Sequence, residues 1–397
     1  MIKSDFPIFN KHSNLIYLDN GATTHKPKVL IEAISDYYSN KNSNVGRGVY
    51  ELADISEQAM TEGRETIASF IGTKSKNIVF TSGCTDSINQ VSFLAEQLLK
   101  PNQKIILSIF EHHANILPWQ RLAKKLKLEI IFISDEFTLS NPESLPDNFW
   151  NNVGLISLTH VSNVTGQIHP IKKWCDIAKS HNIITSIDGA QGISSQLVNV
   201  VDLNCDFYSF SAHKVYGPMG LGILYLSDNI LKNIFDPLKL GGGIVEEVSN
   251  IDYSLIEGNL KFEAGTPNVA DIYAFSEVIK YLIDNNWELL LNKTKLLHEY
   301  LFLKLNTIID IEIIKPTLLP FTHIVSFKIK GIHPHDIGTF LSENNIAIRV
   351  GKHCTHPLHK HLNLNSSARI SLAIYNTKED IDLLIISLLK CIKFFKG

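Results

Sequence analysis

The sequence predicts an α/β fold, with a large domain built on a mostly parallel seven-stranded sheet and a smaller α+β domain. Three observations support this prediction. Short apolar runs recur between residues 78 and 226, segments of helical period separate several of them, and the pattern changes after about residue 267. Strands that are apolar on both faces are typical of a parallel sheet covered by helices on both sides.

The large sheet is expected from seven runs of apolar and β-branched residues. These runs span residues 78–81, 105–108, 130–133, 153–158, 183–187, 207–210 and 223–226. Helical periodicity appears between several of them, at residues 85–99, 117–126 and 171–181. This alternation of strand and helix is the pattern of a doubly covered sheet.

Beyond residue 267 a long helical pattern leads into a second set of strands and helices. Strands are expected at residues 311–314, 324–329, 346–349 and 369–372, and helices near residues 335–343 and 378–395. We therefore predict a large domain of residues 13–285. Residues 286–397, joined by residues 1–12, would form the small domain.

The composition is that of an ordinary globular protein. Of 397 residues, 44% are hydrophobic and 19% are charged, and the net charge of −3 gives no basic surface for nucleic acid. No apolar run approaches the roughly 20 residues that span a bilayer, and the first residues carry no signal or transit pattern. We expect a cytoplasmic protein that binds neither nucleic acid nor membranes.

The cysteines are five in number and widely scattered, at positions 84, 175, 205, 354 and 391. They form no CxxC pair and show no spacing typical of metal ligands. This pattern favours a reducing compartment, and it argues against both a disulfide framework and a metal site.

Polar residues gather just after the predicted strands, where ligands collect in open α/β sheets. The segment TSGCTDSIN, residues 81–89, turns from a strand into a helix at a glycine. Free backbone N–H groups at such a helix start suit a phosphate, and Thr85 adds a hydroxyl. The same segment also fits an ordinary capped turn.

Three further strand ends carry candidate binding residues. EHHANILPW contains His112, whose side chain can lie flat on a ring or transfer a proton near neutral pH. HVSNVTG contains Asn163, and IDGAQG contains Asp188, a carboxylate that can pair with a protonated ring nitrogen. Taken alone, these residues equally fit a solvated loop, an Asx turn and a helix cap.

Lys214 lies in SAHKVYGPMG, between an apolar strand and a turn of glycine and proline. A lysine that forms a Schiff base must lose its proton, and partial burial lowers the pKa of a lysine in that direction. A surface lysine beside a turn is the alternative. Further along, Thr266 in FEAGTPN either caps a helix or reaches the phosphate of a neighbouring subunit.

Cys354 lies in RVGKHCTHP, a loop segment that also contains Arg349 and Lys352. A cationic setting favours the thiolate, which is the nucleophilic form of cysteine, whereas most free cysteines are buried and inert. Arg369 opens the next strand in ARISLAIYNT, where its fork of donors suits a carboxylate.

In this order, the segments resemble one family along nearly the whole chain, from about Tyr17 to the last helix. The matching segments are YLDNGATT, EHHANILPW, HVSNVTG, DGAQG, CDFYSFSAHKVYGPMGLGILY, KFEAGTPN, IAIRVGKHC and ARISLAIYNT. They resemble the group II, SufS-like cysteine desulfurases of the class V aminotransferase family. The RxGxHC segment discriminates best, because the related group I enzymes carry a different and longer cysteine loop.

The resemblance implies the pyridoxal 5′-phosphate (PLP)-dependent transferase fold of type I, with PLP bound by the large domain. Lys214 would carry PLP as a Schiff base, with His112 stacked on its ring. Asp188 would pair with the ring nitrogen, and Gln191 would contact the phenolic oxygen. The phosphate would be held by the loop residues Cys84, Thr85, Ser211 and His213, and by Thr266 from the second subunit of a homodimer.

The resemblance also implies a reaction that converts L-cysteine to L-alanine. Arg369 would bind the substrate carboxylate, Arg349 and Asn163 would help to place it, and Arg47 would line the entrance. Cys354, carried by the small domain, would take the sulfur as a persulfide. An acceptor protein of the SUF iron–sulfur assembly pathway would then receive that sulfur.

Four positions depart from the family pattern: Cys84 replaces threonine, Gly21 and Thr355 replace alanine, and Gly46 replaces a frequent histidine. None of these changes removes a chemical role.

Three alternative functions stay open: a selenocysteine lyase of the same fold, an aminotransferase-like lyase, and a cofactor-free scaffold in a sulfur-transfer complex.

Overall fold

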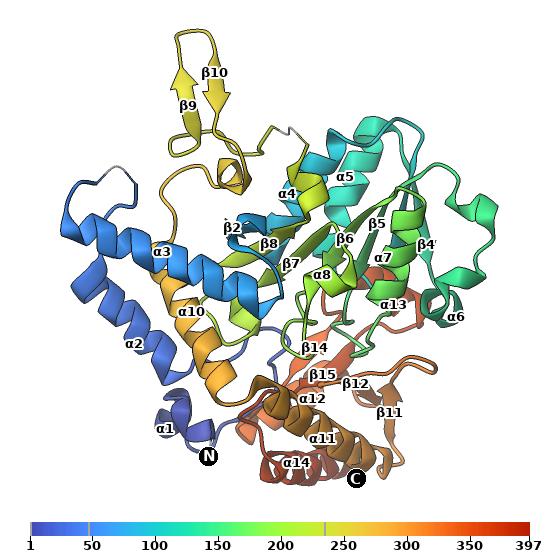
Figure 1. The fold of residues 1–397 in the computed structure, drawn as a ribbon. Coiled ribbons are helices and arrows are strands. Elements are labelled where there is room, and N and C mark those ends of the chain that lie inside the picture. The colour runs from blue at the N-terminus through green and yellow to red at the C-terminus, as the bar shows by residue number, and fades with distance from the viewer. Residues whose placement is uncertain (1, 47, 234–235) are drawn as a thin grey trace.

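The computed structural model describes residues 2–46, 48–233 and 236–397, so that Arg47, a predicted entrance residue, lies outside the described residues. The central element is a seven-stranded sheet with the strand order β2-β8-β7-β6-β5-β3-β4 (Figure 1). Strand β8 runs antiparallel to β2 and β7, and the other neighbouring pairs are parallel. The predicted α/β fold with a mostly parallel seven-stranded sheet is therefore confirmed.

The strands of this sheet lie within two residues of the predicted runs. They are β2 (Ile78–Thr81), β3 (Lys104–Ser108), β4 (Glu129–Ile133), β5 (Val153–Thr159), β6 (Ile184–Asp188), β7 (Phe207–Ser211) and β8 (Gly222–Leu226). The other strands are β1 (Ile16–Tyr17), β9 (Val245–Val248), β10 (Tyr253–Leu255), β11 (Ile311–Ile314), β12 (Ile324–Ile329), β13 (Ile346–Ala347), β14 (Arg349–Gly351) and β15 (Ser367–Ser371).

Helices fill most of the connections between strands. They are α1 (Ile8–Lys11), α2 (Lys28–Asp36), α3 (Glu51–Phe70), α4 (Cys84–Glu96), α5 (Leu117–Leu126), α6 (Glu136–Ser140), α7 (Ile171–Ser180), α8 (Val200–Leu203), α9 (Asp228–Leu231), α10 (Val269–Asp284), α11 (Trp287–Asn306), α12 (Pro334–Glu343), α13 (His356–His361) and α14 (Lys378–Lys396). The short helices are η1 (Ile2–Asp5), η2 (Tyr37–Lys41, a π-helix), η3 (Ser75–Asn77), η4 (His113–Asn115), η5 (Pro142–Ser144), η6 (Asp147–Trp150), η7 (Ala212–Lys214) and η8 (Asn259–Phe262).

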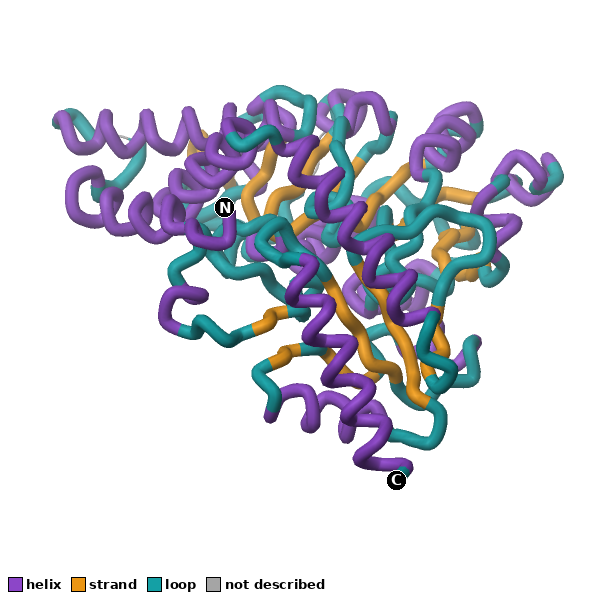
Figure 2. The backbone as a smooth tube through the Cα atoms, turned by 90° about the horizontal axis from the view of Figure 1, so that it is seen from below, coloured by secondary structure: helices purple, strands orange, loops and turns teal. Residues whose placement is uncertain are grey.

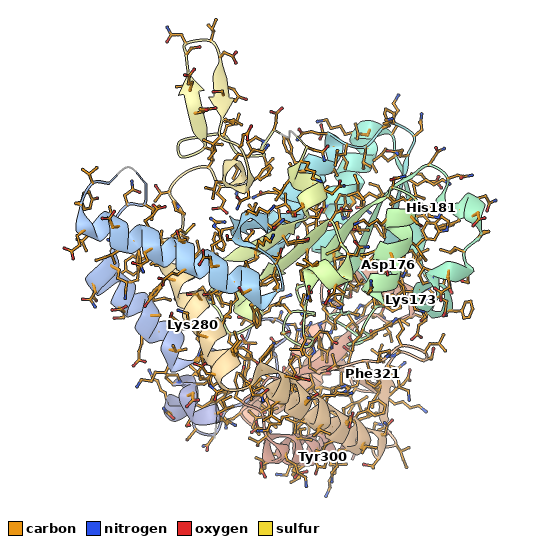
Figure 3. The ribbon with its side chains drawn as sticks, in the orientation of Figure 1. Lys173, Asp176, His181, Lys280, Tyr300 and Phe321 are labelled. Atoms are coloured by element: carbon orange, nitrogen blue, oxygen red, sulfur yellow. The ribbon has the colours of Figure 1, made fainter. Side chains whose placement is uncertain are left out.

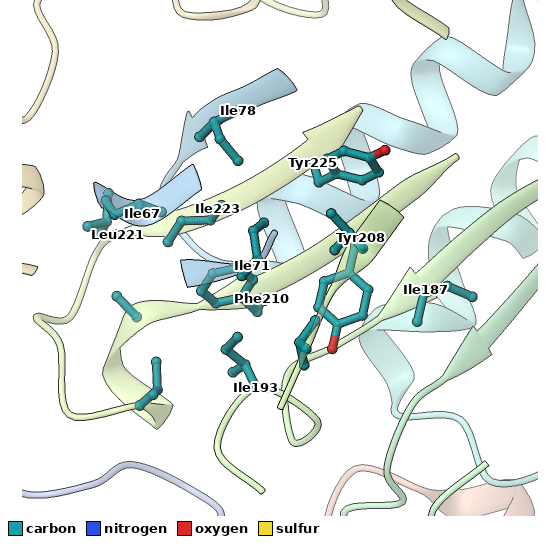
Figure 4. Packing of buried hydrophobic residues seen from close by; sticks show 14 of the residues in the cluster. Ile67, Ile71, Ile78, Ile187, Ile193, Tyr208, Phe210, Leu221, Ile223 and Tyr225 are labelled. Atoms are coloured by element: carbon teal, nitrogen blue, oxygen red, sulfur yellow. The ribbon is translucent and has the colours of Figure 1, made fainter. Parts of the chain in front are cut away.

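The large sheet is buried on both faces because successive residues of its strands enter different apolar clusters. In β2, Ile78 belongs to one cluster and the next residue, Val79, belongs to the other. On the first face, Phe210 of β7 and Ile223 of β8 pack with Ile67 of α3 (Figure 4). Successive side chains of a strand point to opposite faces, so strands covered on both sides must be apolar throughout.

Helix α7 shows how a covering helix meets this core. Trp174 and Ala178 are buried in the first cluster, one turn apart on the same side of the helix. Lys173 and Asp176 are exposed and point away from the sheet (Figure 3). The sequence pattern of apolar and charged positions thus fixes which face of the helix packs inward.

The second sheet has the order β11-β12-β15-β14, and all its neighbouring strands are antiparallel. Helices α11 and α12 pack against its strands and α14 packs against both of these helices, and this layer can be followed from below in Figure 2. A third apolar cluster lies between them, with Leu301, Phe327 and Leu384 fully buried. This unit matches the predicted α+β region.

The N-terminal segment contributes to both cores. Phe6 and Phe9 belong to the first cluster of the large sheet. Ile16 and Leu18 belong to the cluster of the small sheet, and β1 pairs in parallel with β13. The division at residues 13 and 286 stays a prediction, but the packing shows that the chain passes from the core of the large sheet to that of the small sheet before residue 20.

Two local features differ from the predicted elements. The expected strand at residues 346–349 is divided into β13 and β14, which belong to separate sheets. The β9–β10 hairpin, which projects from the molecule (Figure 1), had no predicted counterpart. None of the helices in the described part of the chain is both long and apolar enough to cross a membrane.

Candidate active site

A cavity of about 370 Å³ lies where the end of the large sheet faces the small sheet. It brings together 12 of the 14 residues predicted to form the site. These are Cys84, Thr85, His112, Asn163, Asp188, Gln191, Ser211, His213, Lys214, Arg349, Cys354 and Arg369. Thr266 lines other cavities of the chain, so its expected role through a second subunit stays a prediction.

Lys214 ends the short helix η7, directly after β7. Burial lowers the pKa of its amine, and the negative charge of Asp188 only partly opposes this effect. An apolar strand ending in a tight turn thus presents a lysine whose neutral form is favoured. A neutral amine is the form that acts as a nucleophile or a base.

Asp188 is the last residue of β6 and is only 3% exposed. The backbone N–H of Ala190 donates to its Oδ1 at 2.9 Å, and the thiol of Cys84 lies 3.4 Å from the same oxygen. Burial and Asp188 together raise the pKa of Cys84, so its Sγ keeps its proton and donates to Asp188. The unusual cysteine of the predicted phosphate loop therefore helps to hold this carboxylate.

His112 caps the short helix η4, and its Nδ1 accepts a hydrogen bond from the N–H of Ala114 at 3.1 Å. The neutral ring therefore carries its proton on Nε2. Burial, followed by the positive charge of Lys214, lowers the pKa of His112 to about 4. The ring is neutral at neutral pH and keeps one N–H to donate.

The start of α4 lies beside the turn that follows β7. The backbone N–H of Cys84 donates to Ser211 Oγ at 2.7 Å, and Thr85 and His213 line the cavity next to this contact. The first N–H groups of a helix have no partners within the helix and suit an anionic group. This end of the cavity is the one suited to a phosphate.

Several buried polar atoms around the cavity have no hydrogen-bond partner among the described residues. They are Asn163 Oδ1, Gln191 Oε1, His213 Nδ1 and Arg369 Nε. A buried polar atom without a partner costs about 1–3 kcal/mol, so such a group of atoms indicates a polar ligand. With the amine of Lys214 and the carboxylate of Asp188, these atoms fit a phosphorylated ring such as PLP.

Arg349 and Arg369 are joined through Asp19, a residue that the sequence interpretation did not single out. Arg349 Nε donates to both oxygens of Asp19 at 3.0 Å, and Arg369 Nη2 donates to Oδ1 at 3.1 Å. Arg369 Nη1 also donates to the backbone oxygen of Asn163 at 2.9 Å. The available signal was the motif YLDNGATT, in which Asp19 follows a short strand.

Gly21 leaves room for this arrangement. A Cβ atom at Gly21 would lie 3.2 Å from Arg369 Nη2 and 3.3 Å from its Cζ, which is closer than ordinary van der Waals contact. The alanine that the family resemblance implies at this position would thus press on the guanidinium. The glycine allows Arg369 to lie directly against the N-terminal segment.

Cys354 lies in the turn between β14 and α13, with its side chain exposed. His353 and Cys354 both have left-handed backbone angles, with φ of 50° and 56°. Residues other than glycine adopt this conformation at a cost of about 1–2 kcal/mol, so neighbouring groups must hold the turn. Asn163 Nδ2 donates to the backbone oxygen of His353 at 2.8 Å, which is one such restraint.

Cys354 differs from the other cysteines in its exposure. Cys84, Cys175, Cys205 and Cys391 are all buried.

Among the residues that the structure describes, no group of three or more His, Cys, Asp or Glu side chains is arranged to hold a metal ion.

Comparison with known proteins gives a consistent family. The model of the class-V aminotransferases matches residues 16–384. A protein of Halobacterium salinarum named "Probable cysteine desulfurase" is 35% identical over 392 residues, covering 97% of this chain and 94% of that protein. A protein of Borreliella burgdorferi with the same name is 38% identical over 405 residues, covering 99% of this chain and 96% of that protein.

A solved structure is also similar to this chain in its fold. It is the apo form of the cysteine desulfurase from Thermococcus onnurineus NA1, which superposes with a TM-score of 0.94 at 33% identity. The match covers 99% of this chain and 98% of that one. The likeness therefore extends over both the large and the small sheet.

Proposed function

The chain belongs to the class-V aminotransferase family, and from this premise we propose that it is a PLP-dependent cysteine desulfurase. It would convert L-cysteine to L-alanine and take the sulfur onto Cys354. The observation that carries the proposal is that Lys214, which follows β7 of the large sheet, and Cys354, which follows β14 of the small sheet, line one cavity. Relatives named cysteine desulfurases support the same activity.

The residues of the cavity would hold the cofactor in one orientation. Lys214 would bind it covalently, Asp188 would keep the ring nitrogen protonated, and His112 would lie on the ring. Gln191 would lie against the phenolic oxygen, where its Oε1, buried without a partner, can accept a hydrogen bond. The phosphate would lie at the α4 end, against Cys84, Thr85, Ser211 and His213.

When bound, PLP supplies an electron sink that stabilises negative charge developing on the substrate. Lys214 would remove the proton from Cα of the substrate, since burial favours its neutral amine. His112 would hold a proton on Nε2, because its Nδ1 already accepts from Ala114. Lys214 can therefore take up the substrate proton as its neutral amine, whereas His112 offers only a hydrogen bond from its Nε2.

The substrate carboxylate would bind the guanidinium of Arg369. This side chain is 2% exposed and has an Nε without a partner, so a carboxylate would satisfy a buried donor. Arg349 adds a second positive charge at the entrance. Because both arginines contact Asp19, their positions are fixed before the substrate arrives.

Sulfur transfer then requires one bond to form and one to break. The thiolate Sγ of Cys354 would attack the sulfur of the substrate, forming an S–S bond. The Cβ–S bond breaks, its electron pair stays with Cβ, and protonation of Cβ completes alanine. Cys354 keeps the transferred sulfur as a persulfide, and no external oxidant or reductant is needed.

We further propose the wider setting that the family resemblance suggests. The persulfide would pass to an acceptor protein of the SUF type for iron–sulfur cluster assembly, and the protein would act in the cytoplasm. It would work as a homodimer in which Thr266 of one subunit completes the phosphate site of the other. The exposed thiol of Cys354 supports transfer to another protein.

Mass spectrometry after exposure to L-cysteine tests the main proposal. We expect a gain of about 32 Da on the peptide that contains Cys354, as persulfide formation requires, together with release of alanine. Cys354→Ala should abolish both products while the bound cofactor stays visible. Cys391→Ala, which changes a buried cysteine in α14, is the matched control and should behave as the wild type.

Two results would contradict this assignment. Full alanine production by Cys354→Ala from cysteine would remove Cys354 from the reaction. Wild-type protein that acts on selenocysteine and not on cysteine would instead favour a selenocysteine lyase. Activity of Cys354→Ala with selenocysteine alone would not contradict the desulfurase function of the wild type.

A further inference from the structure

We propose that His113 is the positioning residue that fastens the Cys354 turn to the large domain. The inference rests on the proposed function, because it concerns how Cys354 is presented to the cavity. Its basis is a pair of hydrogen bonds that enclose the cysteine, together with the strained backbone that they restrain.

The first bond joins the backbones of the two segments. The N–H of His113 donates to the backbone oxygen of Cys354 at 2.8 Å. The second bond uses the His113 side chain, whose Nε2 accepts from the backbone N–H of His356 at 3.1 Å. One residue of η4 therefore contacts the turn at Cys354 and again two residues later.

The two imidazole rings add a further contact. The rings of His113 and His356 meet edge to face, with their centroids 4.6 Å apart and their planes at 89°. Such an arrangement places a ring edge against an aromatic face, which is a favourable geometry. Burial, followed by His356, lowers the pKa of His113, so its Nε2 stays available as an acceptor at neutral pH.

The turn needs such restraints because its conformation is costly. His353 and Cys354 are consecutive residues with left-handed backbone angles, and each costs free energy that the surroundings must supply. Asn163 holds the turn at His353, on the side that precedes the thiol. His113 holds it at and after the thiol, so the two residues restrain the turn from both sides.

The side chain of His113 is the part of this arrangement that a substitution can remove. Any residue at this position keeps the backbone N–H that donates to Cys354. Only a side chain that places an acceptor at the position of Nε2 keeps the bond from His356. A glutamine reaches that position with its amide oxygen, whereas an asparagine is too short by about one methylene.

Hydrogen exchange of the full-length holoprotein without substrate tests this role. We expect the peptide around residues 352–357 to exchange about fivefold faster in His113→Asn than in the wild type, the size expected for one lost hydrogen bond. His113→Gln should restore slow exchange. His356→Ala is the matched control, because it keeps the backbone donor and removes only the ring contact.

Kinetics give a second readout. In His113→Asn we expect a lower kcat for sulfur transfer and a nearly unchanged KM for cysteine, since the arginines that bind the carboxylate are untouched. A general loss of folding would instead lower the melting temperature and affect both constants. Equal exchange in wild type and His113→Asn would overturn the proposal, as would His113→Gln exchanging as fast as His113→Asn.

The exchange experiment uses no substrate, so its result does not depend on desulfurase activity. Failure of the proposed function would appear as absence of a persulfide on Cys354. Failure of the positioning role would appear as an unchanged exchange rate at the turn. The two outcomes can therefore be told apart in the same protein preparation.

Discussion

The two sides of the cavity are built in different ways. The large-domain side carries Asp188 and Lys214 at the ends of neighbouring strands, where regular backbone and a continuous core hold them. The opposite side carries Cys354 on a turn with left-handed backbone and an exposed thiol. One side is held by a sheet, and the other is held by a few hydrogen bonds.

This difference fits the two tasks of the proposed reaction. A cofactor must keep a fixed orientation toward its substrate, because displacement by about 1 Å is costly in catalysis. A thiol that receives sulfur and passes it on must first reach into the cavity and then be reached from outside. A strand end suits the first task, and a fastened turn suits the second.

The largest expected effect comes from the sheet side. Lys214→Ala should remove both alanine and persulfide formation, with a fall in rate of at least about 10³-fold, because the covalent anchor and the base are lost together. The visible absorption of lysine-bound cofactor should disappear, whereas it persists in Cys354→Ala. Lys214→Arg keeps a positive charge, cannot supply a neutral amine, and should also be inactive.

Persistence of the same absorption band in Lys214→Ala would show that the cofactor is attached elsewhere. Such a result would contradict the difference drawn between the two sides of the cavity, because the strand ends would no longer be the side that holds the cofactor. Absorption and activity should be measured on the same preparation.

The next effect is expected at the junction of the two sides. Asp19→Asn removes the charge that holds Arg349 and Arg369 together, and the loss of charge-assisted bonds should raise the KM for cysteine about tenfold. Steady-state kinetics measure this change. Asp310→Asn is the control, because Asp310 pairs with Lys396 far from the cavity.

The direction of the change is decisive. A lower KM in Asp19→Asn would mean that Asp19 competes with the substrate carboxylate instead of placing its binding groups. An unchanged KM would remove Asp19 from the site altogether.

The last expected effect concerns the stability of the sheet side in acid and leaves the chemistry of the site unchanged. Burial lowers the pKa of His160 and of His169 from the usual 6.5 to about 4. The folded state keeps these rings neutral while the unfolded chain binds protons below pH 6.5, so stability is complete above that pH and falls as the pH drops toward 4. At pH 5 each ring would cost about 2 kcal/mol.

Urea unfolding at pH 7, 6 and 5 measures this dependence. His160→Gln should have a weaker pH dependence than the wild type, because one of the titrating groups is gone. Since both histidines lie at the sheet side, a pH dependence that is unchanged in this variant would indicate that acid acts through other groups, such as those near the Cys354 turn.

The fold could be predicted from the sequence largely because the sheet is buried on both faces. Runs such as residues 153–158 are apolar without interruption, and few other structures require this pattern. The β9–β10 hairpin gave no such signal, since Glu246, Glu247 and Val248 of β9 are all exposed. A pair of strands that contacts little of the core needs no apolar run, so the sequence pattern does not reveal it.

The site could be predicted where a residue follows an apolar strand and missed where its role depends on a distant partner. Lys214 and Asp188 belong to the first kind. Asp19 belongs to the second, since it contacts Arg349 across 330 positions of the chain. His113 is similar: the sequence showed two adjacent histidines, but their different contacts appear only in three dimensions.

The burial of the other four cysteines has a consequence for the fate of the sulfur. A persulfide can pass its outer sulfur to any thiolate that reaches it, since exchange at sulfur proceeds by thiolate attack. Cys175, Cys205 and Cys391 are enclosed in the core. Cys84 lines the cavity, but burial and Asp188 raise the pKa of its thiol, so it is not available as a thiolate. The described fold therefore offers no competing surface thiol for that exchange. The transferred sulfur is therefore not lost to another cysteine of the same chain. A disulfide between two folded copies would have to join Cys354 to Cys354.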